Sequence, residues 1–166
     1  RICLVGSEMC IRDRKKGATF QDGSPIEAKD VVWSVNRLLA INEGPSYLFE
    51  GVLSEGSVTE IDSSTVQFKL EKTYAPFLTT TPILFVVNSD LAKENAGDGD
   101  PWAQDYIANN SIGAGAFYLD SWERGAGMTI KAYEGYHLGW SDTGIDEVRF
   151  VAVSYTHLTL PTKCWV

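Results

Sequence analysis

The sequence predicts an α+β fold, because helical and strand-like segments are mixed along the chain without the regular alternation of parallel βαβ units. Two observations support this prediction. Residues 24–41 have the periodicity of an amphipathic helix, and residues 58–70 have the alternation of a β-hairpin. After residue 113 the pattern is entirely strand-like, with short segments separated by glycine-containing turns.

The composition is that of an ordinary acidic globular protein. The chain has 166 residues, of which 44% are hydrophobic, and its 14 Lys and Arg against 22 Asp and Glu give a net charge of −8. An acidic balance argues against nucleic-acid binding, since neutralising phosphates requires a basic surface. No run approaches the roughly 18 to 20 consecutive apolar residues that span a bilayer.

The first helix has two possible starts. Ser24, followed by Pro25 and with Glu27 three residues on, fits a capping box with proline at the first helical position. A start a few residues later, with Asp30 in the first turn, fits the pattern equally well.

One apolar stripe defines the buried face of this helix, which is expected to end near residues 39–41. Trp33 lies off the stripe, which predicts that the helix is buried on a second side as well. The stripe consists of Val31, Val35, Leu38 and Leu39.

The remaining elements follow from shorter signals. Segments 58–61 and 65–70 should pair as a hairpin, and 83–87 is a continuous apolar run of the kind found in buried strands. Short helices are expected at 89–95 and 101–109. Three further strands are expected at 116–122, 128–133 and 145–151.

The two ends, residues 1–14 and 153–166, resemble translated read-through of sequencing adapters. We therefore exclude them from the fold prediction and take 15–152 as the biological part. The alternative is that the ends are genuine and fold as strands. These ends contain every cysteine of the chain and one of its two histidines, namely Cys3, Cys10, Cys164 and His157.

The other polar motifs have simpler structural explanations than catalysis. His137 is the only histidine within 15–152, no nucleophile-elbow motif accompanies it, and we expect it to lie at the surface. Gly113 and Gly115 lack the third glycine of a dinucleotide fingerprint, which favours a simple strand entry. We expect no catalytic residue, no metal site and no cofactor. Asp98, Asp100 and Asp105 do not have the spacing of a calcium loop, which favours a solvated loop with a helix cap.

Three stretches resemble family 5 of the extracellular solute-binding proteins, the peptide/nickel type of ABC transporters. They are 17–38, with its aromatic-x-Asp-Gly-x-Pro and Ala-x-Asp-Val motifs, then 61–70, and then 113–118 with the strands after it. The stretches follow the family's order and spacing. The sequence departs from the family pattern at Glu27, Ala114 and Ala116.

The resemblance implies part of the first lobe of a two-lobed, periplasmic-binding-protein-like fold of type II. Residues 15–112 would form the accessory subdomain of that lobe, and 113–152 its returning β-strands. Family members are several times longer, and the second lobe, which supplies much of their ligand cleft, has no counterpart in these residues.

The resemblance also implies a function, which is capture of a solute and its delivery to an ABC permease, without catalysis. A short peptide is the favoured solute, and a nickel chelate, haem or a sugar are the alternatives within the family. Tyr47, which follows the first helix, is the candidate ligand-binding residue, because family members place a cleft-lining aromatic near there. The expected location is periplasmic or extracellular, with or without a lipid anchor.

Two functions of other classes remain as alternatives. One is a small hydrolase that uses His137, and the other is a structural or interaction domain. Replacing His137 would abolish a hydrolase and leave a binding protein unaffected.

Overall fold

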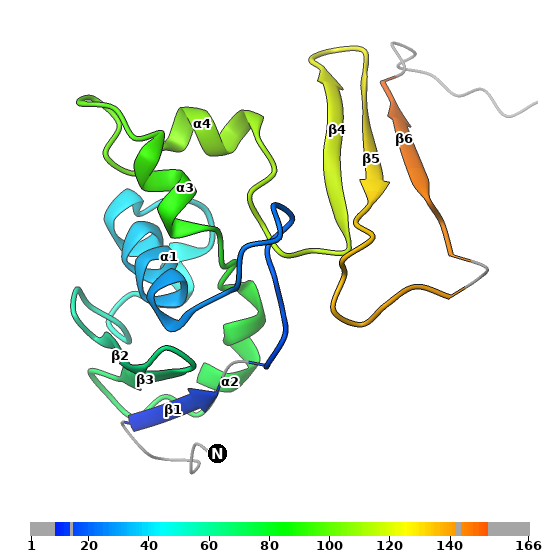
Figure 1. Cartoon of the computed structure of the whole chain (residues 1–166). Helices are drawn as coiled ribbons and strands as arrows, with labels where there is room; N and C mark the ends of the chain where they lie inside the picture. Colours follow the sequence, from blue (N-terminus) through cyan, green and yellow to red (C-terminus); the bar gives the residue numbers. More distant parts are fainter. Residues whose placement is uncertain (1–8, 14, 142–143, 153–166) are drawn as a thin grey trace, which may run out of the picture.

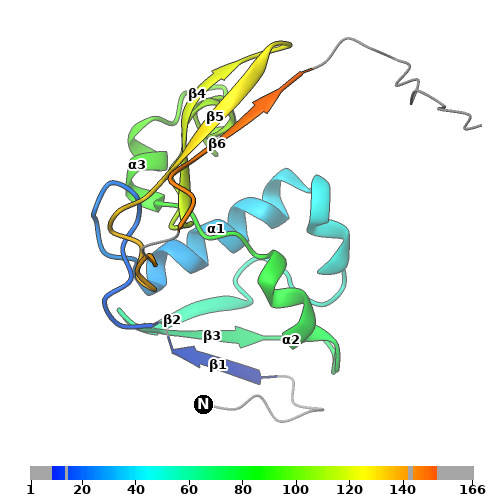
Figure 2. The same cartoon turned by 90° about the vertical axis from the view of Figure 1, so that its right-hand side faces the viewer.

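Two small antiparallel sheets flank a body of short helices (Figure 1). The computed structural model describes residues 9–13, 15–141 and 144–152. One sheet has the strand order β1-β3-β2 and the other the order β4-β5-β6. Helix α1 crosses one face of the first sheet, and the second sheet stands apart from the first (Figure 2).

The first sheet is built on the predicted hairpin of β2 (Val58–Asp62) and β3 (Thr65–Lys69). At its turn, Asp62 accepts hydrogen bonds from the Ser64 backbone N–H and hydroxyl, at 2.8 and 2.7 Å. This Asp-x-Ser arrangement closes the turn locally, and it confirms the prediction of a hairpin at this position.

Strand β1 (Met9–Asp13) lies within the segment that we set aside as adapter-like. The structure does not leave these residues outside the fold, because β1 pairs antiparallel with β3 and closes an edge that β2 leaves open. Cys10 lies opposite Phe68, and both side chains are buried. The origin of residues 1–14 stays a prediction, while Cys3, Cys164, His157 and the whole of 153–166 lie outside the described residues.

Helix α1 (Ala28–Ile41) takes the later of the two predicted starts. The Glu27 backbone N–H donates to the Asp30 carboxylate at 2.8 Å, so Asp30 occupies the first turn. The prediction that Ser24 caps this helix is wrong, because the Ser24 hydroxyl donates to Asp22 at 2.6 Å instead. The helix ends at Asn42, which has a left-handed backbone with φ 54°.

The predicted stripe of α1 packs into the main hydrophobic core. There it meets the inner face of the first sheet and the short elements η1 (Gly44–Leu48) and α2 (Phe77–Thr80). The buried members of this core include Val35, Phe49, Val52, Leu53, Val58, Val66, Phe68, Leu70 and Phe77.

A second, smaller core covers the other side of α1, as predicted from Trp33. The Trp33 ring packs against Trp102 with 5.6 Å between ring centroids. This core lies beside α3 (Ser89–Glu94) and α4 (Gln104–Asn109). The prediction that Asp100 is the N-cap of a helix starting at 101 is wrong, because α4 begins later and its N-cap residue is Ala103. The Asp100 carboxylate still accepts the Asp105 backbone N–H of the first turn at 2.9 Å.

The predicted buried strand at 83–87 is wrong. The segment continues from a short 3-10 turn, η2 (Thr81–Ile83), and pairs with no strand among the residues that the structure describes. Its Val87 backbone N–H donates to the Ser34 hydroxyl of α1 at 3.1 Å, and Phe85 is 77% exposed. A short apolar run was therefore insufficient evidence for a strand in the absence of a neighbouring strand edge.

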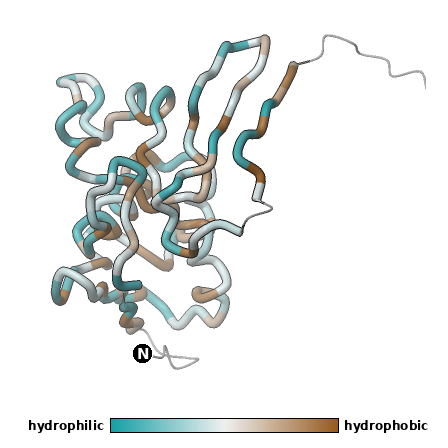
Figure 3. The backbone as a smooth tube through the Cα atoms, turned by 45° about the vertical axis from the view of Figure 1, so that its right-hand side comes forward, coloured by the Kyte–Doolittle hydropathy of each residue, from teal (hydrophilic) through white to brown (hydrophobic). Residues whose placement is uncertain are grey.

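The second sheet is a meander of β4 (Phe117–Glu123), β5 (Gly127–Ala132) and β6 (Glu147–Val151), close to the predicted strands. The register aligns Trp122, Met128 and Phe150 in one row across the sheet. Because successive side chains alternate between faces, this row belongs to an apolar face, and Figure 3 shows the alternation along β6. Trp122 and Phe150 remain 47% and 48% exposed.

Within the described residues, no helix is long and apolar enough to span a membrane.

The packing of the main core predicts that Phe49 and Phe85 differ strongly in their contribution to the free energy of unfolding. Phe49 is fully buried and Phe85 is 77% exposed. We expect Phe49→Ala to lower the free energy of unfolding by about 3–5 kcal/mol, because it removes a buried ring and leaves a cavity. Phe85→Ala should change it by less than about 0.5 kcal/mol. Urea denaturation followed by circular dichroism measures both, and equal effects would contradict this account of the core.

Candidate functional site

A tight turn at residues 20–24 connects the helical body with the second sheet. The Phe20 backbone N–H donates to the Ser24 carbonyl at 2.8 Å, and the Gly23 N–H donates to the Phe20 carbonyl at 3.0 Å. Gly23 has φ 86°, a conformation that a side chain would strain. Because Phe20 is buried, the turn is fixed to the body of the protein.

Gln21 joins this turn to the segment that leads from α4 into the second sheet. Its backbone N–H donates to the Gly113 carbonyl at 3.0 Å. Its side-chain Nε2 donates to the carbonyls of Phe117 and Gly115, at 2.7 and 3.2 Å, while its Oε1 accepts the Ser111 hydroxyl at 2.6 Å. The Gln21 side chain therefore positions the start of β4. Gly113 and Gly115 lie in the segment that enters this strand, as predicted.

Tyr133 makes the second connection, from the end of β5. Its hydroxyl donates to the Phe20 carbonyl at 2.9 Å and lies 3.2 Å from the Thr19 hydroxyl. Its own carbonyl accepts the Trp140 indole N–H at 2.7 Å. Both β4 and β5 are thus tied to the same turn.

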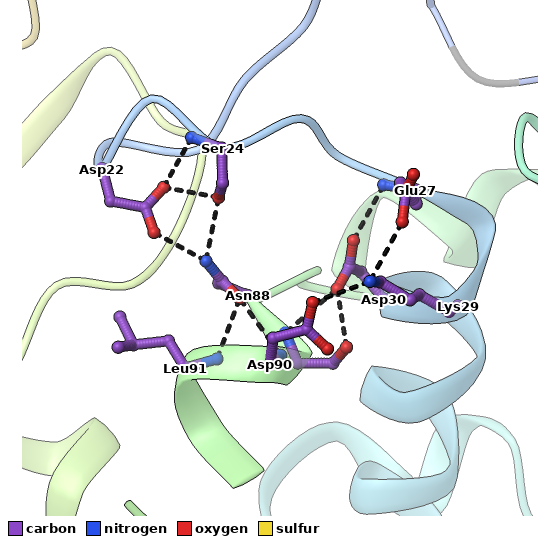
Figure 4. A network of polar contacts seen from close by, with 9 residues as sticks. Asp22, Ser24, Glu27, Lys29, Asp30, Asn88, Asp90 and Leu91 are labelled. Atoms are coloured by element: carbon purple, nitrogen blue, oxygen red, sulfur yellow. Dashed lines mark hydrogen bonds and ion pairs between the residues drawn. The ribbon is translucent and has the colours of Figure 1, made fainter. Parts of the chain in front are cut away.

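A polar network continues from the turn to the start of α3 (Figure 4). The Asn88 side-chain N–H₂ donates to Asp22 at 2.8 Å and to the Ser24 hydroxyl at 3.0 Å. Its side-chain oxygen accepts the backbone N–H groups of Asp90 and Leu91, at 3.1 and 3.0 Å. Asn88 therefore caps α3 and binds the 20–24 turn with the same amide.

Asp30 joins the first turn of α1 to the start of α3. Its carboxylate is buried and accepts the Ser89 backbone N–H and hydroxyl, at 3.0 and 2.7 Å, in addition to the Glu27 N–H. At the surface, Lys29 lies 2.7 Å from Asp90 and 3.0 Å from Glu27. Hydrogen bonds to Asp90 and Glu27 raise the pKa of Lys29 above its ordinary value.

The charge of Asp22 is stabilised by its neighbours. Partial burial would raise the pKa of Asp22, but hydrogen bonds from Ser24 and Asn88 outweigh it and hold the pKa below its ordinary value. Asp22 is therefore an anion at neutral pH.

A cavity of about 590 Å³ opens where the turn meets α3, α4 and the second sheet. Leu91, Ile112 and Leu119 supply apolar surface, and Tyr118 and Tyr133 supply aromatic rings. Asp22 and Glu134 are its charged members, and no Lys, Arg or His is among the described residues that line it. A concave site with a few polar groups at a junction of subdomains is the usual setting for binding a small molecule.

The two residues singled out from the sequence lie elsewhere. Tyr47 belongs to η1, is 69% exposed and does not line this cavity. His137 is exposed, as predicted, and its ring packs against Tyr136 at 4.7 Å between centroids. In the part of the chain that the structure describes, no group of three or more His, Cys, Asp or Glu could hold a metal ion.

The sequence analysis missed Gln21, Asn88 and Tyr133. Asn88 had a usable signal, since it directly precedes a predicted helix and asparagine is a favoured N-cap residue. Gln21 and Tyr133 had none, because their partners lie about 90 or more positions away in the chain.

The sequence profile described as bacterial extracellular solute-binding proteins, family 5 Middle, matches residues 15–159. The chain therefore belongs to family 5 of the bacterial extracellular solute-binding proteins.

Two relatives come from Escherichia coli (strain K12). The chain is 36% identical over 118 residues to the probable D,D-dipeptide-binding periplasmic protein DdpA, covering 70% of this chain and 22% of that protein. It is 30% identical over 129 residues to a dipeptide-binding protein, covering 70% of this chain and 24% of that protein. The chain thus spans about a quarter of the length of the curated relatives it matches.

The solved structures agree on the fold. NikZ from Campylobacter jejuni in complex with Ni(L-His) matches with a TM-score of 0.74 and 21% identity, over 92% of this chain and 29% of that one. The substrate-binding domain of an oligopeptide ABC transporter from Bacillus anthracis matches with a TM-score of 0.72 and 21% identity, over 90% and 30%. The predicted fold, part of a lobe of a type II periplasmic-binding-protein fold, is confirmed.

The buried carboxylate of Asp30 predicts that Asp30 contributes more than Asp90 to the free energy of unfolding. Asp30→Ala leaves the Ser89 N–H and hydroxyl and the Glu27 N–H without their acceptor, and should lower the free energy of unfolding by about 2–5 kcal/mol. Asp90→Ala removes only an exposed ion pair with Lys29 and should cost less than about 1 kcal/mol. Thermal denaturation checks both, and a larger loss for Asp90→Ala would show that this network is misassigned.

Asn88 also predicts a selective change in acidity. Asp22 and Asp62 each accept the N–H and hydroxyl of the serine two residues on, but only Asp22 is bonded to Asn88. We expect Asn88→Ala to raise the pKa of Asp22 and to leave that of Asp62 unchanged.

Carbon-detected NMR titration of the side-chain carboxyls measures both values. Because the folded pKa of Asp22 is depressed, its contribution to stability is present above the unfolded pKa of about 3.8 and is lost as pH falls through the folded pKa. Asn88→Ala should therefore weaken that acid-sensitive part of the stability. An unchanged Asp22 titration would contradict the bond to Asn88.

Proposed function

We propose that this chain forms part of the substrate-binding protein of an ABC transporter, which captures a short peptide and delivers it to a membrane permease. The observation that supports this most directly is the family match over 15–159, together with 36% identity to a protein named for binding D,D-dipeptides. The protein would act by closing two lobes around the solute and then docking on the permease.

Within that protein, we assign 15–112 to the accessory subdomain of the first lobe and 113–152 to its returning strands. The division at 113 is supported by the change from the helical body to the β4-β5-β6 meander, bridged by Gln21 and Tyr133. Tyr47 is our candidate contact to the solute, and its 69% exposure on η1 leaves the ring accessible to a second lobe.

A binding protein needs no catalytic group, and we propose that this one is not an enzyme. Among the described residues no hydrogen bond reaches the imidazole of His137, whereas a hydrolase would need it to contact a nucleophile and a carboxylate. Membership of an extracellular family supports a periplasmic or extracellular location.

A chimera tests this function. Residues 15–152 would replace the matching segment of the dipeptide-binding protein of E. coli, to which the chain is 30% identical. We expect the folded chimera to bind L-Ala-L-Ala or D-Ala-D-Ala in calorimetry, because residues 15–152 would supply the first-lobe surface that the host requires. The unmodified host is the positive control.

A chimera that melts cooperatively, like its host, but gives no heat with any dipeptide would contradict the proposal. His137→Ala in the same chimera separates the enzyme alternative, because it should leave peptide binding unchanged. Release of amino acids by the chimera, abolished in His137→Ala, would instead establish a hydrolase.

A further inference from the structure

We propose that the apolar face of the second sheet is an interface, and that a further apolar segment of the full-length substrate-binding protein covers it. The apolar face is formed by two rows of side chains across β4, β5 and β6. The rows are Leu119, Ile130 and Val148, and Trp122, Met128 and Phe150. The inference rests on the proposed function, in which this chain is one part of a longer protein.

The two faces of the second sheet differ in their chemistry. Residues paired across an antiparallel sheet share a face, and Met128 and Ile130 are two apart on β5, so all six side chains lie on the same side. The opposite side carries the polar row Ser121, Thr129 and Arg149. A sheet with one apolar face normally buries that face against a second layer.

The described part of the chain does not provide this second layer. Beyond Ile112 none of its residues is buried, and neither hydrophobic core includes a member of the apolar face. Leu119 borders the candidate cavity, but Trp122 and Phe150 are 47% and 48% exposed. The Arg124 guanidinium lies 4.7 Å from the centroid of the Trp122 ring and still leaves Trp122 half-exposed.

The remainder of the protein is the source that we infer for this layer. The chain spans about a quarter of the length of its curated relatives, so most of a protein of that size lies outside it. The solved structures likewise combine the same fold with a large amount of further chain. A segment of the same polypeptide is held near the face by the chain itself, so it binds there at a high effective concentration.

The chemistry of the face favours a permanent contact over a transient one. A surface that meets its partner only transiently, such as one that docks on a permease, is about as polar as the rest of the protein surface. Permanent contacts are more hydrophobic and resemble a domain core. The apolar face carries no charge, and its Trp122, Met128 and Phe150 side chains are of the types enriched at the buried centres of interfaces.

Met128 and Thr129 provide a matched pair of variants. They are neighbours on the central strand β5 and lie on opposite faces of the sheet. Met128→Asp places a negative charge on the apolar face, and Thr129→Asp places the same charge on the polar face.

The first experiment uses the full 166-residue chain, in which the covering segment would be absent. The dye ANS, which binds exposed apolar surface, should lose about half or more of its fluorescence with Met128→Asp and keep it with Thr129→Asp. Equal fluorescence with the two variants would show that the face is not open and would overturn the proposal. This measurement requires only the chain itself, so it can overturn the proposal whether or not a chimera folds.

The second experiment uses the chimera with the dipeptide-binding protein, in which the host supplies the remainder. Met128→Asp should lower the Tm of the chimera by at least about 5 °C more than Thr129→Asp, because it would place a charge in a buried apolar contact. In the 166-residue chain the two variants should differ by less than about 2 °C, since neither residue belongs to a core.

The same Tm difference in both contexts, or none in the chimera, would overturn the covering segment. Analytical ultracentrifugation of the chimera tests the other occupant of matching chemistry. A dimer that Met128→Asp dissociates and Thr129→Asp does not would assign the face to a second copy and refute the further segment.

The two proposals fail in distinguishable ways. If the chimera binds dipeptides but Met128→Asp and Thr129→Asp have equal effects in it, the covering segment is wrong and the transport function stands. If Met128→Asp selectively destabilises a monomeric chimera that binds no dipeptide, the covering segment stands and the peptide function is wrong.

Discussion

The arrangement of the second sheet relative to the helical body depends on the hydrogen bonds that the Gln21 side chain makes. The second sheet contributes to neither hydrophobic core, so its orientation relative to the helices is set by a small number of polar contacts. Two of these join the Gln21 side chain to the carbonyls of Gly115 and Phe117, and the others include the Tyr133 hydroxyl bond to Phe20 and an exposed bond from Arg124 to Asn109. Since hydrogen bonds are directional, a few of them define an angle that non-specific apolar contact would leave open.

The network around Asn88 and Asp30 extends the same constraint into the helices. Asp30 fixes the starts of α1 and α3 relative to each other, and Asn88 fixes the start of α3 to the turn. The turn, both helix starts and the entry into β4 therefore form one connected polar unit. The candidate cavity lies against this unit.

Local and periodic features of the sequence predicted most of the fold. The α1 stripe, the second buried side at Trp33, the hairpin of β2 and β3 and the strands of the second sheet follow from patterns of fewer than twenty residues. The failures involve long-range partners. Ser24 was predicted as a cap from spacing alone, whereas Asp22 takes its hydroxyl. The apolar run at 83–87 was predicted as a strand but has no neighbouring strand among the described residues. Residues 9–13 were left out of the fold prediction, but they form β1 and pair with β3. Of the candidate site, Asp22 entered the sequence analysis only through the Asp-Gly motif of the stretch 17–38, and the bridging roles of Gln21 and Tyr133 had no sequence signal.

The half-exposed apolar face of the second sheet has a consequence for the order in which the protein opens. Within the described part of the chain, each of its strands pairs only with its neighbour in sequence, and neither core includes the row of Trp122, Met128 and Phe150. Such a meander can lose its pairing without disturbing the packing of α1 on the first sheet. We therefore expect it to behave as a separate cooperative unit with a low opening free energy, whose amide hydrogens exchange with solvent through local opening before the main core unfolds.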